Sequence, residues 1–141
     1  MMNKQSVIDL LQEHGVQSTQ QRIEIAQILF AKPQHLSADQ VLAKVNHKRN
    51  IVSKATVYNS LGLFARKGMI REIIADPNRV FYDSNTSEHH HFFNVDTGEL
   101  SDLPNENITV NELPGLPEGT VADSIDVIFK VRNKAEKPSV F

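Results

Sequence analysis

Three consecutive histidines, His89 to His91, fall where an alternating apolar segment begins. Because successive side chains of a strand point to opposite faces, His89 and His91 share one face and His90 points away. Asp83 and Asp102 lie at the edges of extended segments on either side. Imidazole and carboxylate groups without sulfur form a ligand set for a divalent ion such as Fe, Mn or Zn. The pattern predicts a metal site, although a His-x-His at a strand start can also be only a polar edge.

Capping residues predict four short helices before this cluster. Their expected N-caps are, in chain order, Ser6, Ser18 or Thr19, Ser37 with a capping-box partner at Gln40, and Ser53. The first, second and fourth helices are expected to end at Gly15, Pro33 and Gly68. His35 precedes the third N-cap, so we expect it on a loop, free to turn toward another part of the chain.

The fourth expected helix has the character of a DNA-reading element. Val57, Leu61 and Phe64 mark its buried side. The residues left toward solvent are Lys54, Ala55, Tyr58, Asn59 and Arg66. Small, hydrogen-bonding and basic side chains near a helix N-terminus suit insertion into a DNA major groove. Extended segments over 69–75 and 79–82, joined by a turn at 76–78, complete the pattern of a winged helix with its wing at about 70–83. An ordinary amphipathic core helix is the alternative for the fourth helix.

Charge divides the chain in the same place. Residues 1–80 hold 11 Lys or Arg against 6 Asp or Glu, whereas residues 81–141 hold 4 against 11. A positive segment suits a polyanion and an acidic one suits a cation, although two solvated faces of differing sign would look the same. The chain has no cysteine, which excludes disulfides, thiolate-zinc sites and thiol catalysis. No leader pattern and no apolar run of membrane-spanning length is apparent, so we expect a cytoplasmic protein.

The second half reads as a small sheet. Residues 92–95 and 99–103, joined by a turn at 96–98, predict a β-hairpin, 108–110 lie in an irregular connection, and 124–132 predict a later strand. Three strands bury too little area to be stable alone, so we expect a homodimer in which a second copy completes the sheet. The expected fold class is α+β. It comprises a winged-helix DNA-binding domain over 1–84, a small α/β dimerisation and sensing domain over 85–133 and a disordered tail over 134–141.

Several segments together resemble one family. Residues 18–22, 35–40, 53–61 and 87–91 are similar in order and spacing to the Fur (ferric uptake regulator) family of metal-dependent transcriptional regulators. The later segments 89–93, 116–119 and 125–128 are more similar to its iron response regulator (Irr) branch. The resemblance implies a DNA-binding regulator of iron or metal homeostasis, most simply a repressor, that is not an enzyme.

The same resemblance assigns roles to particular residues. The implied ligands of one divalent metal (Fe2+, Mn2+ or Zn2+) per subunit are His35, Asp83, His89, His91 and Asp102. Arg22 and Tyr58 would contact DNA phosphates, and Lys54, Ala55, Thr56 and Asn59 would lie near base edges. A homodimer would read double-stranded inverted-repeat DNA with half-sites about one helical turn apart.

The chain also departs from the family pattern. Asn94 and Thr97 stand where many relatives have the first cysteines of a structural zinc site, and Ser124 stands where a further site needs a histidine. Haem, which the iron response branch implies, would have to act through His89, His90 or His91.

Two rival functions stay open from sequence. Two histidines and a carboxylate also suit a metal-dependent enzyme of the facial-triad type. A winged-helix regulator that needs no ligand is the other alternative.

Overall fold

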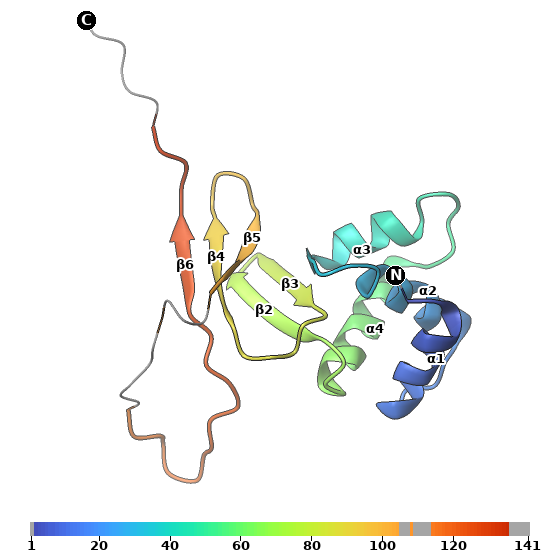
Figure 1. Ribbon diagram of the computed structural model, residues 1–141, viewed down its shortest axis with the longest axis horizontal. Coiled ribbons are helices and arrows are strands. Elements are labelled where there is room, and N and C mark those ends of the chain that lie inside the picture. Colours follow the sequence, from blue (N-terminus) through green and yellow to red (C-terminus); the bar gives the residue numbers. More distant parts are fainter. Residues whose placement is uncertain (1, 105–107, 109–113, 136–141) are drawn as a thin grey trace, which may run out of the picture. The chain divides into compact units, whose positions relative to one another are not determined.

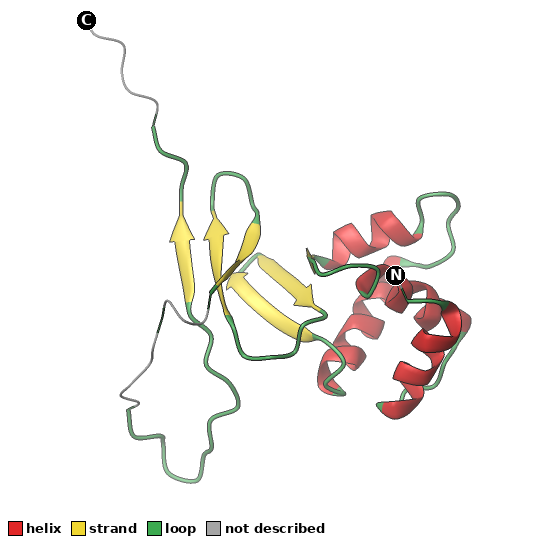
Figure 2. Ribbon diagram, in the orientation of Figure 1, coloured by secondary structure: helices red, strands yellow, loops and turns green. Residues whose placement is uncertain are grey.

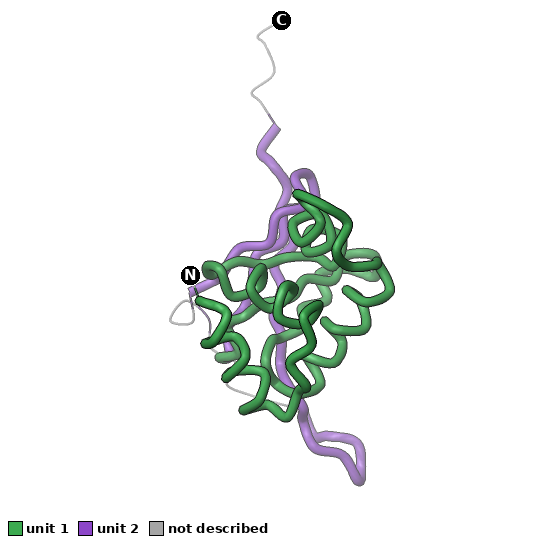
Figure 3. Tube along the Cα trace, turned by 90° about the vertical axis from the view of Figure 1, so that its right-hand side faces the viewer, with its two compact units in different colours: residues 1–87 green, residues 88–141 purple. Residues whose placement is uncertain are grey.

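The computed structural model describes residues 2–104, 108 and 114–135. The chain divides into two compact units, residues 1–87 and 88–141 (Figure 3). The sequence predicted a domain boundary between residues 84 and 85, and the division into compact units falls between Ser87 and Glu88. No helix in the described part of the chain is both long and apolar enough to cross a membrane.

The first unit combines a helical group with a small antiparallel sheet (Figures 1 and 2). Its elements in chain order are α1 (Lys4–Glu13), α2 (Gln20–Leu29), β1 (His35–Leu36), α3 (Ala38–Val45), α4 (Lys54–Arg66), β2 (Arg71–Asp76) and β3 (Arg79–Asp83). The sheet order is β1-β3-β2, with both neighbouring pairs antiparallel. The β2–β3 hairpin follows α4 directly, as a winged helix requires.

Local capping explains where the helices begin. The side chains of Thr19, Ser37 and Ser53 each accept a backbone N–H of the following first turn, and Ser37 forms the expected capping box with Gln40. The expected N-cap of the first helix was wrong, because the side chain of Asn3 accepts the backbone N–H of Ser6 and starts the helix earlier. Asn3 is an equally good N-cap and adds residues to the helix.

The core of the first unit joins all four helices. Its fully buried side chains include Val7 and Leu11 of α1, Ile25 of α2, Val41 of α3 and Phe64 of α4. Burying an aliphatic or aromatic side chain of this size contributes about 1.5–3 kcal/mol. This shared core fixes α4 against α2 and α3, so the outward residues of α4 are held on a rigid support.

The second unit is a three-stranded sheet. Its strands are β4 (His90–Asn94), β5 (Leu100–Leu103) and β6 (Ile128–Val131), in the order β5-β4-β6. β4 pairs antiparallel with β5, as the hairpin pattern predicts, and parallel with β6. The last strand is shorter than the predicted 124–132, and the described residues of this unit contain no helix. Of the predicted connection at 108–110 only Ile108 is described, and of the predicted tail 134–141 only 134–135.

Candidate metal centre and DNA-reading surface

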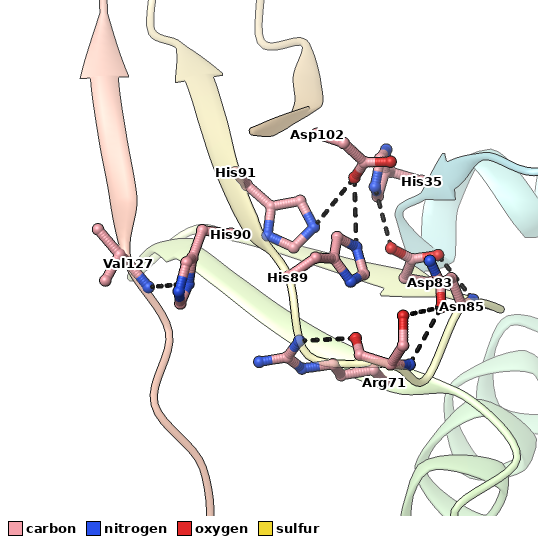
Figure 4. A network of polar contacts seen from close by, with 10 residues as sticks. His35, Arg71, Asp83, Asn85, His89, His90, His91, Asp102 and Val127 are labelled. Atoms are coloured by element: carbon pink, nitrogen blue, oxygen red, sulfur yellow. Dashed lines mark hydrogen bonds and ion pairs between the residues drawn. The ribbon is translucent and has the colours of Figure 1, made fainter. Parts of the chain in front are cut away.

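The first unit places one histidine opposite one aspartate. His35 lies in β1 and is the register partner of Asp83 in β3, so their side chains share a face of the sheet. His35 Nε2 lies 3.0 Å from Asp83 Oδ2, while Asp83 Oδ1 accepts the backbone N–H of Asn85 at 2.9 Å (Figure 4). The expectation that His35 sits on a free loop was wrong. β1 pairs with β3, a partner distant in sequence, and this pairing fixes the histidine.

The second unit gathers two histidines around one carboxylate. His91 in β4 is the register partner of Asp102 in β5, and His89 is two residues earlier on the same face. Asp102 Oδ1 lies 3.2 Å from His89 Nε2 and 3.4 Å from His91 Nε2, and the two imidazole centroids are 4.5 Å apart (Figure 4). His89 and His91 are buried, whereas the Asp102 side chain is 57% exposed. The alternation predicted from sequence therefore holds at this cluster.

His90 has a different environment from its neighbours. Its Nδ1 accepts the backbone N–H of Val127 at 3.1 Å, just before β6 begins (Figure 4). Accepting this hydrogen bond requires Nδ1 to be deprotonated. His90 therefore helps fasten the segment before β6 to β4 and does not face Asp102.

These donor sets fit a divalent transition metal. Within the second unit, His89, His91 and Asp102 each offer a ligand atom within 4.8 Å of the others. Such spacing brackets one ion, because metal–nitrogen and metal–oxygen bonds are about 2.0–2.2 Å long. Nitrogen and carboxylate oxygen donors suit Fe, Mn and Zn, and the chain has no cysteine that would favour softer ions. His35 and Asp83 supply one nitrogen and one oxygen of the same kind in the first unit.

The N-terminal half of α4 presents polar and basic side chains to solvent. Lys54, Ala55 and Asn59 are exposed, Tyr58 is 44% exposed, and Thr56 is half-buried. Val57 and Leu61 point into the core, as the periodicity predicts. Polar and basic side chains of this kind can read base edges when a helix lies in a DNA major groove.

Arg22 lies beside this surface. Its Nη1 donates to the backbone carbonyl of Gln17 at 3.1 Å, which holds the half-buried side chain along the N-terminus of α2. A surface hollow of about 280 Å3 separates the ends of α2 and α4. It is lined by Thr19, Gln21, Arg22, Thr56, Asn59 and Ser60. The predicted DNA residues Arg22, Thr56 and Asn59 therefore share one depression in the first unit.

Several contacts near α4 were missed from sequence. The Tyr58 hydroxyl donates to Asp39 Oδ1 at 3.3 Å, and Lys54 Nζ lies 3.9 Å from the same oxygen. Asn46 bonds the backbone at both Ile51 and Val52, which fixes the loop leading into α4. Asp39 is on α3, so its contacts with Tyr58 and Lys54 depend on how α3 packs on α4 and no local pattern marks them. Asn46 is the C-cap of α3 and bonds the loop that follows it.

Comparison with known proteins bears on both features. A family model described as the Ferric uptake regulator family matches residues 13–116. The peroxide operon regulator of Bacillus subtilis (strain 168) is 31% identical over 111 residues, which are 79% of this chain and 71% of that protein. The peroxide-responsive repressor PerR of Staphylococcus epidermidis is 30% identical over 93 residues, which are 66% of this chain and 62% of that protein.

Solved structures agree with this relationship. The ferric uptake regulator from Pseudomonas aeruginosa with manganese aligns with a TM-score of 0.69 at 25% identity, covering 95% of this chain and all of that one. The ferric uptake regulator from Francisella tularensis with iron has the same TM-score at 23% identity, covering 85% and 93%. These relatives are transcriptional regulators and not enzymes, so the facial-triad enzyme suggested by the donor set is not the function of this chain.

Proposed function

Because this chain belongs to the ferric uptake regulator family of metal-responsive transcriptional regulators, we propose that one divalent ion, bound by its own histidines and aspartates, controls how tightly it binds operator DNA. The observation that carries the proposal is the pair of cross-strand clusters, His35 with Asp83 and Asp102 with two histidines. Family regulators bind DNA and are generally dimeric. Here the first unit supplies one cluster and the second unit supplies the other.

The proposed ion has five ligands, His35, Asp83, His89, His91 and Asp102. Neither cluster fills the coordination shell of a first-row metal alone, since one offers two donors and the other three. Asp83 and His89 are six residues apart, so the connecting chain keeps their Cα atoms within about 22 Å of each other. A connection this short therefore limits how far the two clusters can separate.

An ion held by both units biases the angle between them. A ligand shifts a conformational equilibrium only by its differential affinity for the two states, and a shift from 1:99 to 99:1 needs about 10⁴-fold preference. A metal that binds one arrangement with five ligands and another with only two or three has a source for such preference. The arrangement of the two reading helices in a dimer then depends on metal occupancy.

The donor chemistry favours Fe2+, Mn2+ or Zn2+, and the Pseudomonas aeruginosa relative was solved with manganese. We do not propose haem as the ligand. His90 uses Nδ1 to accept the Val127 N–H, and His89 and His91 both face Asp102. Closeness to the iron response branch stays a prediction from the sequence.

On DNA, α4 is proposed to enter the major groove. Lys54, Ala55, Thr56 and Asn59 would then lie near base edges, while Arg22 and Tyr58 would contact phosphates. A homodimer presents two such helices and reads an inverted repeat with half-sites about one helical turn apart. Such a regulator works where the chromosome is, which places it in the cytoplasm.

A DNA-binding assay with defined metal content tests the proposal. A duplex is first selected from a random-sequence pool by the wild-type protein under anaerobic conditions with Mn2+. Its affinity for chelator-treated and Mn2+-, Fe2+- or Zn2+-loaded protein is then measured by fluorescence anisotropy. We expect metal to change the Kd of the wild type by at least about tenfold, which lies within the usual allosteric coupling range.

Histidine variants identify the site in the same assay. His89→Ala removes a proposed ligand and should abolish the metal effect. His90→Ala, the neighbouring matched control, should keep it, because His90 faces Val127. Equal DNA affinity of apo and metal-loaded wild type would contradict metal control. An intact metal effect in His89→Ala would contradict the ligand set.

A further inference from the structure

The acidic residue Asp39 lies beside the exposed N-terminal half of α4, whose side chains are proposed to contact DNA. Asp39 lies in the first turn of α3, with 71% of its side chain exposed. Its Oδ1 accepts the Tyr58 hydroxyl hydrogen at 3.3 Å and lies 3.9 Å from Lys54 Nζ. Lys54 Nζ is also 5.7 Å from the centroid of the Tyr58 ring. The three side chains form a small cluster that joins α3 to the exposed face of α4.

A carboxylate at this place disfavours DNA binding on electrostatic grounds. It repels phosphates and partly neutralises the one lysine in the first turn of α4. An acid in the first turn of a helix stabilises the helix dipole, which explains why Asp39 is acidic in α3. The dipole does not explain why the same oxygen meets two side chains of the neighbouring helix.

We propose that Asp39 is a specificity-determining residue that holds Lys54 and Tyr58 in place and competes with DNA phosphates for them. The inference rests on the proposed DNA-binding function of α4. In free protein the carboxylate occupies the hydrogen-bonding groups that any phosphate would otherwise attract. When operator DNA binds, the Lys54 ammonium is already restrained between the Tyr58 ring and the Asp39 carboxylate.

The two roles act differently on specific and non-specific DNA. Non-specific binding consists almost entirely of phosphate contacts, so a lysine restrained by an acid weakens it directly. Specific binding also gains from base contacts, for which an oriented side chain loses less freedom. Removing the charge of Asp39 should therefore strengthen non-specific binding more than operator binding and lower their ratio.

Asp39→Asn tests this with minimal change of shape. The metal-loaded full-length protein is titrated with the selected duplex and with a duplex of the same composition and scrambled half-sites, at several salt concentrations. We expect the scrambled duplex to bind about three- to tenfold tighter at low salt, with the slope of log K against log salt steeper by about 1, because one more phosphate is neutralised. Affinity for the selected duplex should rise less than about twofold, so discrimination falls.

Two further variants separate the proposal from general charge effects. Asp9→Asn makes the same charge change on α1, where Asp9 Oδ1 accepts a hydrogen bond from Gln5 Nε2, and should leave both affinities unchanged. The double variant Asp39→Asn with Lys54→Met should lose most of the gain, because the freed lysine is absent. Thermal unfolding of each variant checks that the folded fraction is equal at the assay temperature.

The DNA affinities of the wild type and these variants test the role of Asp39. If Asp39→Asn and Asp9→Asn change binding alike, or if the gain persists without Lys54, the inference is wrong while the proposed function stands. If the wild type binds neither duplex in any metal state, the proposed function fails and the inference fails with it. A selective loss of discrimination in Asp39→Asn alone supports the assignment.

Discussion

Asn94 joins the turn after β4 to the segment after β6. Its Oδ1 accepts the backbone N–H groups of Asp96 and Thr97 at 2.9 and 3.1 Å, and its Nδ2 donates to Asn133 Oδ1 at 2.8 Å. The backbone N–H of Asn133 in turn donates to Asp96 Oδ2 at 2.9 Å. The family resemblance matches Asn94 and Thr97 to the first cysteines of a structural zinc site, and in this chain hydrogen bonds join the same turn to the segment after β6.

Replacing Asn94 by Ala should loosen β6 from β4. Three hydrogen bonds are lost, each with a net contribution of about 0.5–1.5 kcal/mol that is reduced by solvent exposure, so we expect a loss of about 1–2 kcal/mol. Hydrogen exchange by NMR checks this at the Val95 amide, which donates to the Val131 carbonyl. Its exchange should accelerate about tenfold.

Asn85→Ala is the matched control for this loss. Asn85 Oδ1 accepts from the backbone and hydroxyl of Ser87, two residues away, so these bonds are local to the segment after β3. The variant should leave exchange at Val95 unchanged. Equal acceleration in both variants would mean that Asn94 does not fasten β6.

Two glycines, one inside α4 and one just after it, have opposite backbone requirements. Gly62 lies in the helix interior, where an added Cβ would meet only the end of the flexible Arg66 side chain at 3.3 Å. Gly68 follows the helix with φ +77° and has open space around the position of a Cβ. Space therefore does not distinguish the two sites, whereas backbone conformation does.

Alanine should consequently have opposite effects at the two positions. Gly62→Ala should stabilise the chain by about 0.5–1 kcal/mol, because alanine lowers the entropy of the unfolded chain and suits a helix. Gly68→Ala should destabilise it by about 1–2 kcal/mol, because the left-handed conformation is strained for residues with a Cβ. Urea unfolding followed by circular dichroism measures both. Stabilisation by Gly68→Ala would show that the helix does not end as described.

Which elements the sequence predicts follows from the range of the interactions that form them. The N-caps at Thr19, Ser37 and Ser53 each bond a backbone N–H three residues later, so the local sequence is sufficient to predict them. The short strand at His35 depends on β3, which lies more than 40 residues later, so the local sequence around His35 predicts a loop. The parallel pairing of β6 with β4 cannot be predicted for the same reason, because the order of strands joined by a long connection leaves no local pattern in the sequence.

The candidate site divides in the same way. The shared face of His89 and His91 follows from strand alternation, and the hairpin that brings Asp102 opposite His91 has a local turn. The pairing of His35 with Asp83 required the family resemblance, because composition and spacing placed His35 only before a cap. The contact of Asp39 with Tyr58 depends on helix packing, and neither periodicity nor the resemblance indicated it.

The whole molecule distributes charge and apolar surface unequally between its units. The first 80 residues carry the excess of basic residues, which suits contact with DNA. The second unit instead exposes apolar side chains on β6, with exposed fractions of 48% at Phe129 and 37% at Val131. Phe129 packs against Phe92 across the sheet with ring centroids 6.0 Å apart. A three-stranded sheet with such a face is suited to cover it with a second copy.

Phe129→Asp should therefore dissociate the proposed homodimer. A charge placed at an aromatic residue in the centre of an interface weakens association strongly, so we expect the dimer Kd to rise by at least about tenfold. Ile74→Asp is the matched control, because Ile74 is 59% exposed on β2 of the first unit and receives the same charge. Sedimentation velocity across a concentration series measures both variants, and a wild type that is monomeric at micromolar concentration would contradict the dimer.

The same two variants also test whether DNA recognition depends on dimerisation. If two copies are needed to span an inverted repeat, Phe129→Asp should lose the preference for a duplex with two half-sites over one with a single half-site, while Ile74→Asp should keep it.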